Sequence, residues 1–152
     1  MSNLKKQIAV IGGRDATKQQ LNLAKAIGKL LAKNNFQMIC GGMGGVMKAS
    51  CEGNSSCGGH PIGILPGKEK SEGNKFLSVA IATGIGIARN SILAHSADAA
   101  IAISGKYGTL SEIAYFLQLE KPVICLDCNW DIEGILKVES PEQAIEMLEK
   151  FL

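Results

Sequence analysis

The sequence predicts an α/β fold, a single Rossmann-like doubly wound parallel sheet with helices on both faces. Short runs of Val, Ile and Ala alternate with longer segments in which apolar residues recur at helical spacing. The short runs are continuously apolar, which is typical of strands buried on both faces of a parallel sheet. A chain of 152 residues, 46% of them hydrophobic, is long enough for one buried core, so one domain over residues 1–152 is expected.

The amino-terminal half begins this alternation. Its first run is β-branched and ends at two glycines, and the helix after it is supported by Thr17 and Gln20, which have the spacing of a reciprocal N-terminal cap. The second run ends in the glycine-rich turn 41–45, after which another helix is expected. Strands are predicted at 7–11, 37–40 and 62–65, and helices at 18–34 and 46–56.

The carboxyl-terminal half repeats the pattern after the charged segment 67–75, which is interpreted as a solvated loop, with an active-site lid as the alternative. A weakly apolar strand comes next, followed by a fully apolar one. The last helix opens at Pro141, with Ser140 and Gln143 placed for another capping box. Strands are predicted at 78–83, 98–103 and 123–126, and helices at 88–97, 109–119 and 141–151.

Three glycine clusters stand at the ends of predicted strands: Gly12-Gly13, Gly41 to Gly45, and Gly105 to Gly108. Ligands of open parallel sheets bind beyond the carboxyl ends of the strands, so the clusters are expected to converge on one crevice. Glycine lets a ligand approach the backbone, and the helix that follows presents free N–H groups. Each cluster alone is explained by a tight turn, but three together favour an anionic site, with phosphate as the natural occupant.

The kind of phosphate ligand is narrowed by motifs that are missing. The sequence has no G-x-x-x-x-G-K-[ST], which disfavours a P-loop nucleotidase. Gly12-Gly13-Arg14-Asp15 does not match G-x-G-x-x-G, and the second strand ends in glycines where an acidic residue would bind an NAD ribose. A dehydrogenase is therefore also disfavoured.

Two charged residues accompany the third cluster. The segment 105–109 is expected to wrap a phosphate at the start of a helix, with the Thr109 hydroxyl as a donor. Glu112, one turn later, either belongs to the site or forms a capping box with Thr109. Arg89 lies in the first turn of its predicted helix, where the helix dipole disfavours a cation. It should therefore pair with the phosphate or with Glu112, unless it simply extends into water.

Four motifs resemble those of the LOG-like Rossmann superfamily, once misnamed lysine decarboxylases, and the match covers nearly the whole chain. Gly41-Gly42-Met43-Gly44-Gly45-Val46-Met47 resembles its G-G-x-x-G-x-M turn, and Gly63-Ile64-Leu65-Pro66 its G-[IV]-[IL]-P strand end. Gly105-x-x-Gly108-Thr109-x-x-Glu112 resembles its P-G-G-x-G-T-x-x-E signature. Arg89-Asn90 is most similar to the molybdenum-cofactor carrier proteins, whereas the cytokinin-activating phosphoribohydrolases usually have Arg-Lys there.

The resemblance implies two functions. Carrier proteins bind the phosphate-bearing pterin of molybdenum cofactor without chemistry. Phosphoribohydrolases split a nucleoside 5′-monophosphate into base and ribose 5-phosphate, with an arginine and a glutamate that match Arg89 and Glu112. We expect a ligand-binding protein, with the hydrolase as the alternative and a nucleotide-sensing signalling or DNA-processing relative as a weaker one. The candidate ligand-binding residues are Gly12, Gly13, Gly41, Gly42, Gly44, Gly45, Met47, Arg89, Asn90, Gly105, Lys106, Gly108 and Thr109.

One departure from the signature bears on the ligand. Lys106 replaces a glycine of the motif, which either narrows the phosphate cradle or adds a cation to it. The segment between Pro66 and Arg89 also differs from the hydrolase pattern, and it would help to shape the pocket for the base. The expected ligand is therefore molybdenum cofactor or a nucleoside monophosphate, with no resident cofactor required.

Net charge, hydropathy and cysteine content limit the partners and the cellular location that can be expected. A net charge of +2 gives no reason to expect nucleic acid as a partner, and no apolar run is long enough to span a membrane, so a cytoplasmic protein is expected. Five scattered cysteines fit reduced thiols. Cys125 and Cys128 have the C-x-x-C spacing of redox sites, but they end a strand. The sequence has no second C-x-x-C pair with which they could form a zinc site. Related proteins are commonly dimers or tetramers, so a homo-oligomer is expected.

Overall fold

The computed structural model describes residues 3–152, which form one seven-stranded sheet with helices on both faces. Every neighbouring pair of strands is parallel. The strands are β1 (Gln7–Gly12), β2 (Gln37–Cys40), β3 (Ile62–Leu65), β4 (Val79–Ala82), β5 (Ala99–Ile103), β6 (Val123–Leu126) and β7 (Ile135–Val138). The helices are α1 (Lys18–Lys33), α2 (Val46–Ser56), α3 (Arg89–Ser96), α4 (Tyr107–Gln118) and α5 (Pro141–Phe151), with 3₁₀ turns η1 (Lys70–Glu72) and η2 (Gly86–Ala88).

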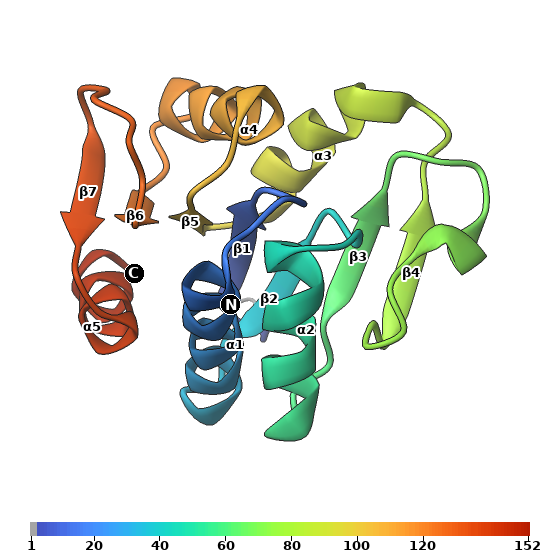
Figure 1. Cartoon of the computed structure of the whole chain (residues 1–152), viewed down its shortest axis with the longest axis horizontal. Coiled ribbons are helices and arrows are strands. Elements are labelled where there is room, and N and C mark those ends of the chain that lie inside the picture. The colour runs from blue at the N-terminus through green and yellow to red at the C-terminus, as the bar shows by residue number, and fades with distance from the viewer. Residues whose placement is uncertain (1–2) are drawn as a thin grey trace.

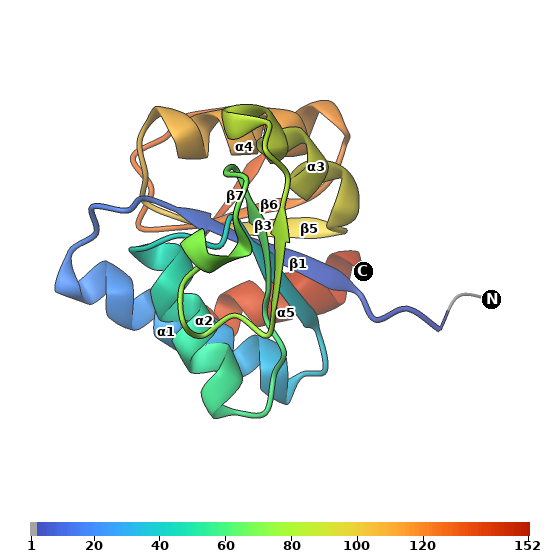
Figure 2. The same ribbon diagram turned by 90° about the vertical axis from the view of Figure 1, so that its right-hand side faces the viewer.

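The strand order is β4-β3-β2-β1-β5-β6-β7, and it reverses direction between β1 and β5. Helices α1, α2 and α5 cover one face of the sheet, and α3 and α4 cover the other (Figures 1 and 2). Because α1 follows β1 on one face and α4 follows β5 on the opposite face, the two connections diverge at the carboxyl ends of these strands. Such a topological switch point leaves a crevice for a ligand.

The inner strands are continuously apolar because both of their faces are buried, whereas the edge strands β4 and β7 are partly exposed. All five residues of β5 are fully buried. Ile101 and Ile103 pack into the cluster beneath α1, α2 and α5, while Ala100 and Ala102 pack with Phe116 of α4 on the other face. The predicted α/β fold with a parallel sheet is confirmed.

The structure differs from the sequence prediction at three places. Strand β7 was not predicted, because no helix separates it from β6 and because the residues of β7 are partly exposed. Helix α4 begins at Tyr107, before the expected Thr109, and its N-cap is Lys106 without a side-chain cap bond. At α5, Ser140 accepts from the N–H of Gln143, but the Gln143 side chain bonds to the neighbouring Glu139 N–H, so the capping box is incomplete. The reciprocal cap at the start of α1 is confirmed.

None of the helices in the part of the chain that the structure describes is both long and apolar enough to cross a membrane.

Helices α1 and α2 cross at very short range, and this contact fixes where α2 begins. A Cβ on Gly28 would lie 2.0 Å from the Ser50 carbonyl oxygen, and one on Gly53 would lie 2.0 Å from the Lys25 carbonyl oxygen. The Asn54 amide donates across the crossing to the Gly28 carbonyl at 3.0 Å. The crossing therefore depends on two glycines, and it sets the position of the α2 amino terminus at the switch point.

We expect Gly28→Ala to lower the free energy of unfolding, because the added methyl group would overlap backbone atoms and the two helices would have to separate. Overpacking of this kind costs about 1–3 kcal/mol, more than the roughly 1 kcal/mol that alanine gains in helix propensity. Gly108→Ala in α4 is the matched control, because a Cβ there meets no atom within 4 Å. Urea titrations of both variants would test this, and equal stability would contradict the account.

Candidate functional site

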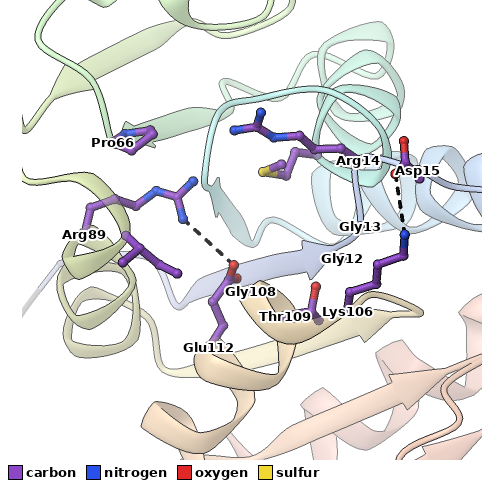
Figure 3. Close-up of a pocket in the computed structure, with 12 residues that line it drawn as sticks. Gly12, Gly13, Arg14, Asp15, Pro66, Arg89, Lys106, Gly108, Thr109 and Glu112 are labelled. Atoms are coloured by element: carbon purple, nitrogen blue, oxygen red, sulfur yellow. Dashed lines mark ion pairs between the residues drawn. The ribbon is translucent and has the colours of Figure 1, made fainter.

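A pocket of about 390 Å³ lies at the switch point, beyond the carboxyl ends of β1 and β5 (Figure 3). Its walls come from the loops after β1, β3 and β5 and from the first turns of α2, α3 and α4. The lining residues are Gly12, Gly13, Arg14, Asp15, Met47, Pro66, Ile87, Arg89, Lys106, Gly108, Thr109 and Glu112.

The first wall is the turn after β1, which packs directly against the start of α2. A Cβ on Gly12 would lie 2.5 Å from the Ile103 carbonyl oxygen of β5 and 2.6 Å from the Val46 side chain. The Gly13 carbonyl accepts the Val46 N–H at 3.0 Å. Only glycine at position 12 permits this close approach, so the sequence here sets the distance between the two sides of the crevice.

The opposite wall is the break between β5 and α4. Ser104 and Gly105 have positive φ values of 52° and 116°, which turn the chain sharply after the strand. Helix α4 then starts at the pocket, and Thr109 and Glu112 on its first turns are buried there. Because no side chain caps α4, the N–H groups of its first turn are available to an anion.

Arg89 opens α3 and is 7% exposed. Its Nη1 donates to Asn90 Oδ1, and its Nη2 donates to the Gly41 carbonyl at 3.4 Å. Its Nη1 lies 3.9 Å from Glu112 Oε1, and Figure 3 shows these two side chains pointing at each other across the pocket. The Nε atom is buried and has no hydrogen-bond partner among the described residues. A buried guanidinium N–H without an acceptor is costly, so this donor favours an added oxyanion.

Burial sets the protonation of Glu112. The side chain is 7% exposed, and burial raises the pKa of Glu112 to about 8 despite the opposing positive charge of Arg89. Burial likewise lowers the pKa of Arg89, although Glu112 raises it and the charge of nearby Arg14 lowers it further. An arginine stays charged under these conditions. Glu112 is therefore mainly a neutral acid at pH 7, able to donate a hydrogen bond beside a cation.

The turn Gly41 to Gly45 supports the site from behind. A Cβ on Gly41 would lie 2.6 Å from Arg89 Nη2 and 2.9 Å from Met47 Sδ, so the bare backbone makes room for the guanidinium. The Asn74 amide donates to the Met43 carbonyl at 3.0 Å. The charged loop 67–75 is thus tied at its end to this turn.

The rim of the pocket carries an ion pair between its two walls. Lys106 Nζ lies 3.7 Å from Asp15 Oδ2, and both side chains are largely exposed (Figure 3). A pair this exposed is worth little in stability, so Lys106 can exchange its partner at small cost.

Eight of the predicted site residues line the pocket: Gly12, Gly13, Met47, Arg89, Lys106, Gly108, Thr109 and Glu112. The others do not line it and lie behind or beside it: Gly41, Gly42, Gly44, Gly45, Asn90 and Gly105. Four lining residues were not predicted from the sequence, namely Arg14, Asp15, Pro66 and Ile87. Arg14 and Asp15 directly follow the first glycine pair, which was a usable signal, and Pro66 ends a motif that was identified.

The structure decides between the alternatives that the sequence left open for Glu112 and Arg89. Glu112 is not the partner in a capping box with Thr109, because α4 begins at Tyr107 and Thr109 lies inside the first turn. Arg89 does not extend into water, since it is buried. Among residues 3–152, no group of three His, Cys, Asp or Glu side chains is placed to hold a metal ion.

Solved structures of similar chains include those of two proteins that are named for molybdenum cofactor. The molybdenum cofactor binding protein from the phototrophic bacterium Rippkaea orientalis is 35% identical, with 98% of each chain covered and a TM-score of 0.93. The molybdenum cofactor carrier protein from Chlamydomonas reinhardtii is 30% identical, with 97% of this chain and 98% of that chain covered and a TM-score of 0.88. These similarities confirm the predicted resemblance to the carrier branch of LOG-like proteins.

Sequence comparison gives the same grouping. An uncharacterized protein of Archaeoglobus fulgidus is 44% identical over 139 residues, which cover 91% of each chain. The model of the SLOG cluster4 family matches residues 5–150. Since this match spans nearly every described residue, the chain belongs to the SLOG cluster4 family.

Proposed function

We propose that this protein binds a phosphate-bearing nucleotide or pterin in the switch-point pocket and acts as a carrier of molybdenum cofactor. The observation that carries the proposal is the buried Arg89, whose Nε faces no acceptor while its Nη atoms are held by Asn90, Gly41 and Glu112. Because Nε is covered by protein atoms in this structure, a phosphate oxygen supplies the missing acceptor once the guanidinium turns toward the pocket. The similar carrier structures support the pterin as the ligand.

The pocket offers separate surfaces for the two parts of such a ligand. In the proposed complex, the phosphate lies at the start of α4, where Thr109 and the free N–H groups donate to it and Lys106 leaves Asp15 to join them. Met47, Pro66 and Ile87 supply a less polar wall for a pterin or a base. Molybdenum would travel as part of the cargo.

Glu112 fits this proposal because it is mainly neutral at pH 7. An ionised carboxylate facing the pocket would repel a phosphate, whereas a protonated one donates a hydrogen bond to it. The raised pKa therefore removes the main objection to a phosphate beside this residue.

The same feature favours a second candidate, a nucleoside 5′-monophosphate phosphoribohydrolase. A buried glutamic acid with a pKa of about 8 can protonate a departing base and, once ionised, stabilise the oxocarbenium-like state of the sugar. Water then adds to the sugar carbon and gives its proton to the Glu112 carboxylate, which forms ribose 5-phosphate and restores the acid. Arg89 would hold the substrate phosphate in place.

We expect the pure protein to bind molybdopterin and to release no free base from AMP or related monophosphates. Isothermal titration and a chromatographic assay for the base measure these two outcomes. Steady base release that is abolished by Glu112→Gln would overturn the carrier function and establish the hydrolase.

Arg89→Met is the variant that tests the site itself. It should weaken binding of the phosphate ligand about tenfold or more, because it removes charge-assisted hydrogen bonds that are worth about 1.5–3 kcal/mol. Lys33→Met makes the same charge change in the last turn of α1, away from the pocket, and should leave affinity unchanged. Equal affinity of both variants would place the ligand elsewhere.

The neutral state of Glu112 also predicts a pH dependence of stability. Its pKa in the folded protein lies above the ordinary value of 4.5, so the folded state holds a proton that the unfolded state has lost between these two values. Its contribution to stability is complete below about pH 4.5 and should disappear as the pH rises through 8. Glu112→Gln should lack this loss. Unfolding titrations from pH 4 to 9 would show it, and parallel curves for the two proteins would contradict it.

We further propose that the protein self-associates through the outer faces of α3 and α4. The apolar residues of these helices divide between core and surface: Leu93 and Phe116 are buried, while Ile92 and Tyr115 are exposed. Ile92→Lys should shift the mass measured by light scattering from an oligomer to the 16.0 kDa monomer. A wild-type protein that is monomeric at micromolar concentration would rule this out.

A further inference from the structure

Two thiols lie together at the end of β6, directly behind the α4 side of the pocket. Cys125 is in β6 and is 2% exposed, whereas Cys128 lies in the loop that follows and is half-buried. Both pack in the hydrophobic cluster on the α3 and α4 face of the sheet, together with Ala102. From the sequence, a redox role for this pair was disfavoured, because the pair ends a strand and does not open a helix.

The chain bends between the two cysteines, at Asp127. Asp127 has a positive φ of 48°, a left-handed conformation that favours such a bend. The Cys128 thiol donates to the Leu126 carbonyl at 3.4 Å and to the Ala102 carbonyl at 3.5 Å. The bend thus returns the second sulfur to the face on which Cys125 lies.

The two thiols differ chemically as an attacking and a resolving thiol do. Hydrogen bonding with Cys128 raises the pKa of Cys125, and burial raises it further. Hydrogen bonding with Cys125 lowers the pKa of Cys128, and the backbone N–H of Ser104 also lowers it. The more acidic thiol is the more exposed one, which is the arrangement that thiol exchange requires.

We propose that Cys125 and Cys128 form a reversible dithiol–disulfide pair that couples to the phosphate-binding loop. The oxidant is a small-molecule disulfide. The Cys128 thiolate attacks one sulfur of that disulfide, forming a mixed disulfide and expelling one thiolate, which takes up the proton that Cys128 lost. Cys125 then attacks Cys128, closes the internal disulfide and releases the second small thiol, which receives the Cys125 proton.

The link to the pocket is Ser104. Its N–H contributes a hydrogen bond to Cys128 and lies 3.3 Å from the Leu126 carbonyl, and Ser104 begins the reversal that carries Gly105 and Lys106. In the disulfide, Cys128 Sγ no longer carries the hydrogen that it donates to the Leu126 and Ala102 carbonyls. Closing the disulfide therefore weakens the hold on this loop.

The test uses the full chain equilibrated in glutathione buffers of increasing oxidation, followed by acid quenching and peptide mass mapping. The peptide that carries both cysteines should lose two hydrogens, and dithiothreitol should restore them. In the same samples, hydrogen exchange of the segment 103–106 should be several-fold faster in the oxidised protein. Neither readout depends on a bound ligand, so both are independent of the proposed function.

Two variants identify the roles of the thiols. Cys125→Ala should stop at a mixed disulfide, with one glutathione on Cys128, and Cys128→Ala should leave Cys125 unmodified because that thiol is buried. Two results would overturn the proposal: the pair stays reduced in pure oxidised glutathione, or the exchange rates of the segment 103–106 are equal in the reduced and oxidised protein.

Discussion

Arg89 places a positive charge where water is nearly excluded, and a buried charge is stable only when it is paired and hydrogen-bonded. The surrounding structure meets this requirement in part. Gly41 supplies a carbonyl and, having no side chain, the space for the guanidinium, while Asn90 accepts a second hydrogen bond. Glu112 is the nearest carboxyl, but burial keeps it mainly protonated, so the positive charge is not cancelled at neutral pH. In the proposed complex, this residual positive charge is what attracts the phosphate.

The fold brings these groups together from distant parts of the sequence. Reversal of strand order between β1 and β5 opens the crevice, and the glycine contact between α1 and α2 sets the start of α2 beside it. Arg89 arrives on α3 and Glu112 on α4, two helices that pack on the same face of the sheet. The position of each charged group therefore follows from packing of its element, because neither lies on a free loop.

Much of this arrangement is readable from the sequence, since buried parallel strands and strand-end glycines leave strong local patterns. Arg89 was expected to pair with a phosphate or with Glu112, because a helix start disfavours a cation, and the structure places Glu112 beside it. The directions in which side chains point could not be predicted from the sequence. Arg14 lines the pocket because the turn after β1 points it there, and Ile87 does so because η2 precedes α3. Strand β7 has no helix before it, and α4 starts early because Lys106 serves as its N-cap without a side-chain bond.

The most direct measurement of the central claim is a crystal structure of the protein soaked with a nucleoside monophosphate. The account predicts the phosphate between the first turn of α4 and Arg89, with one of its oxygens accepting from Arg89 Nε and with Lys106 turned away from Asp15. A phosphate bound at another face of the molecule, with the environment of Arg89 unchanged, would contradict it.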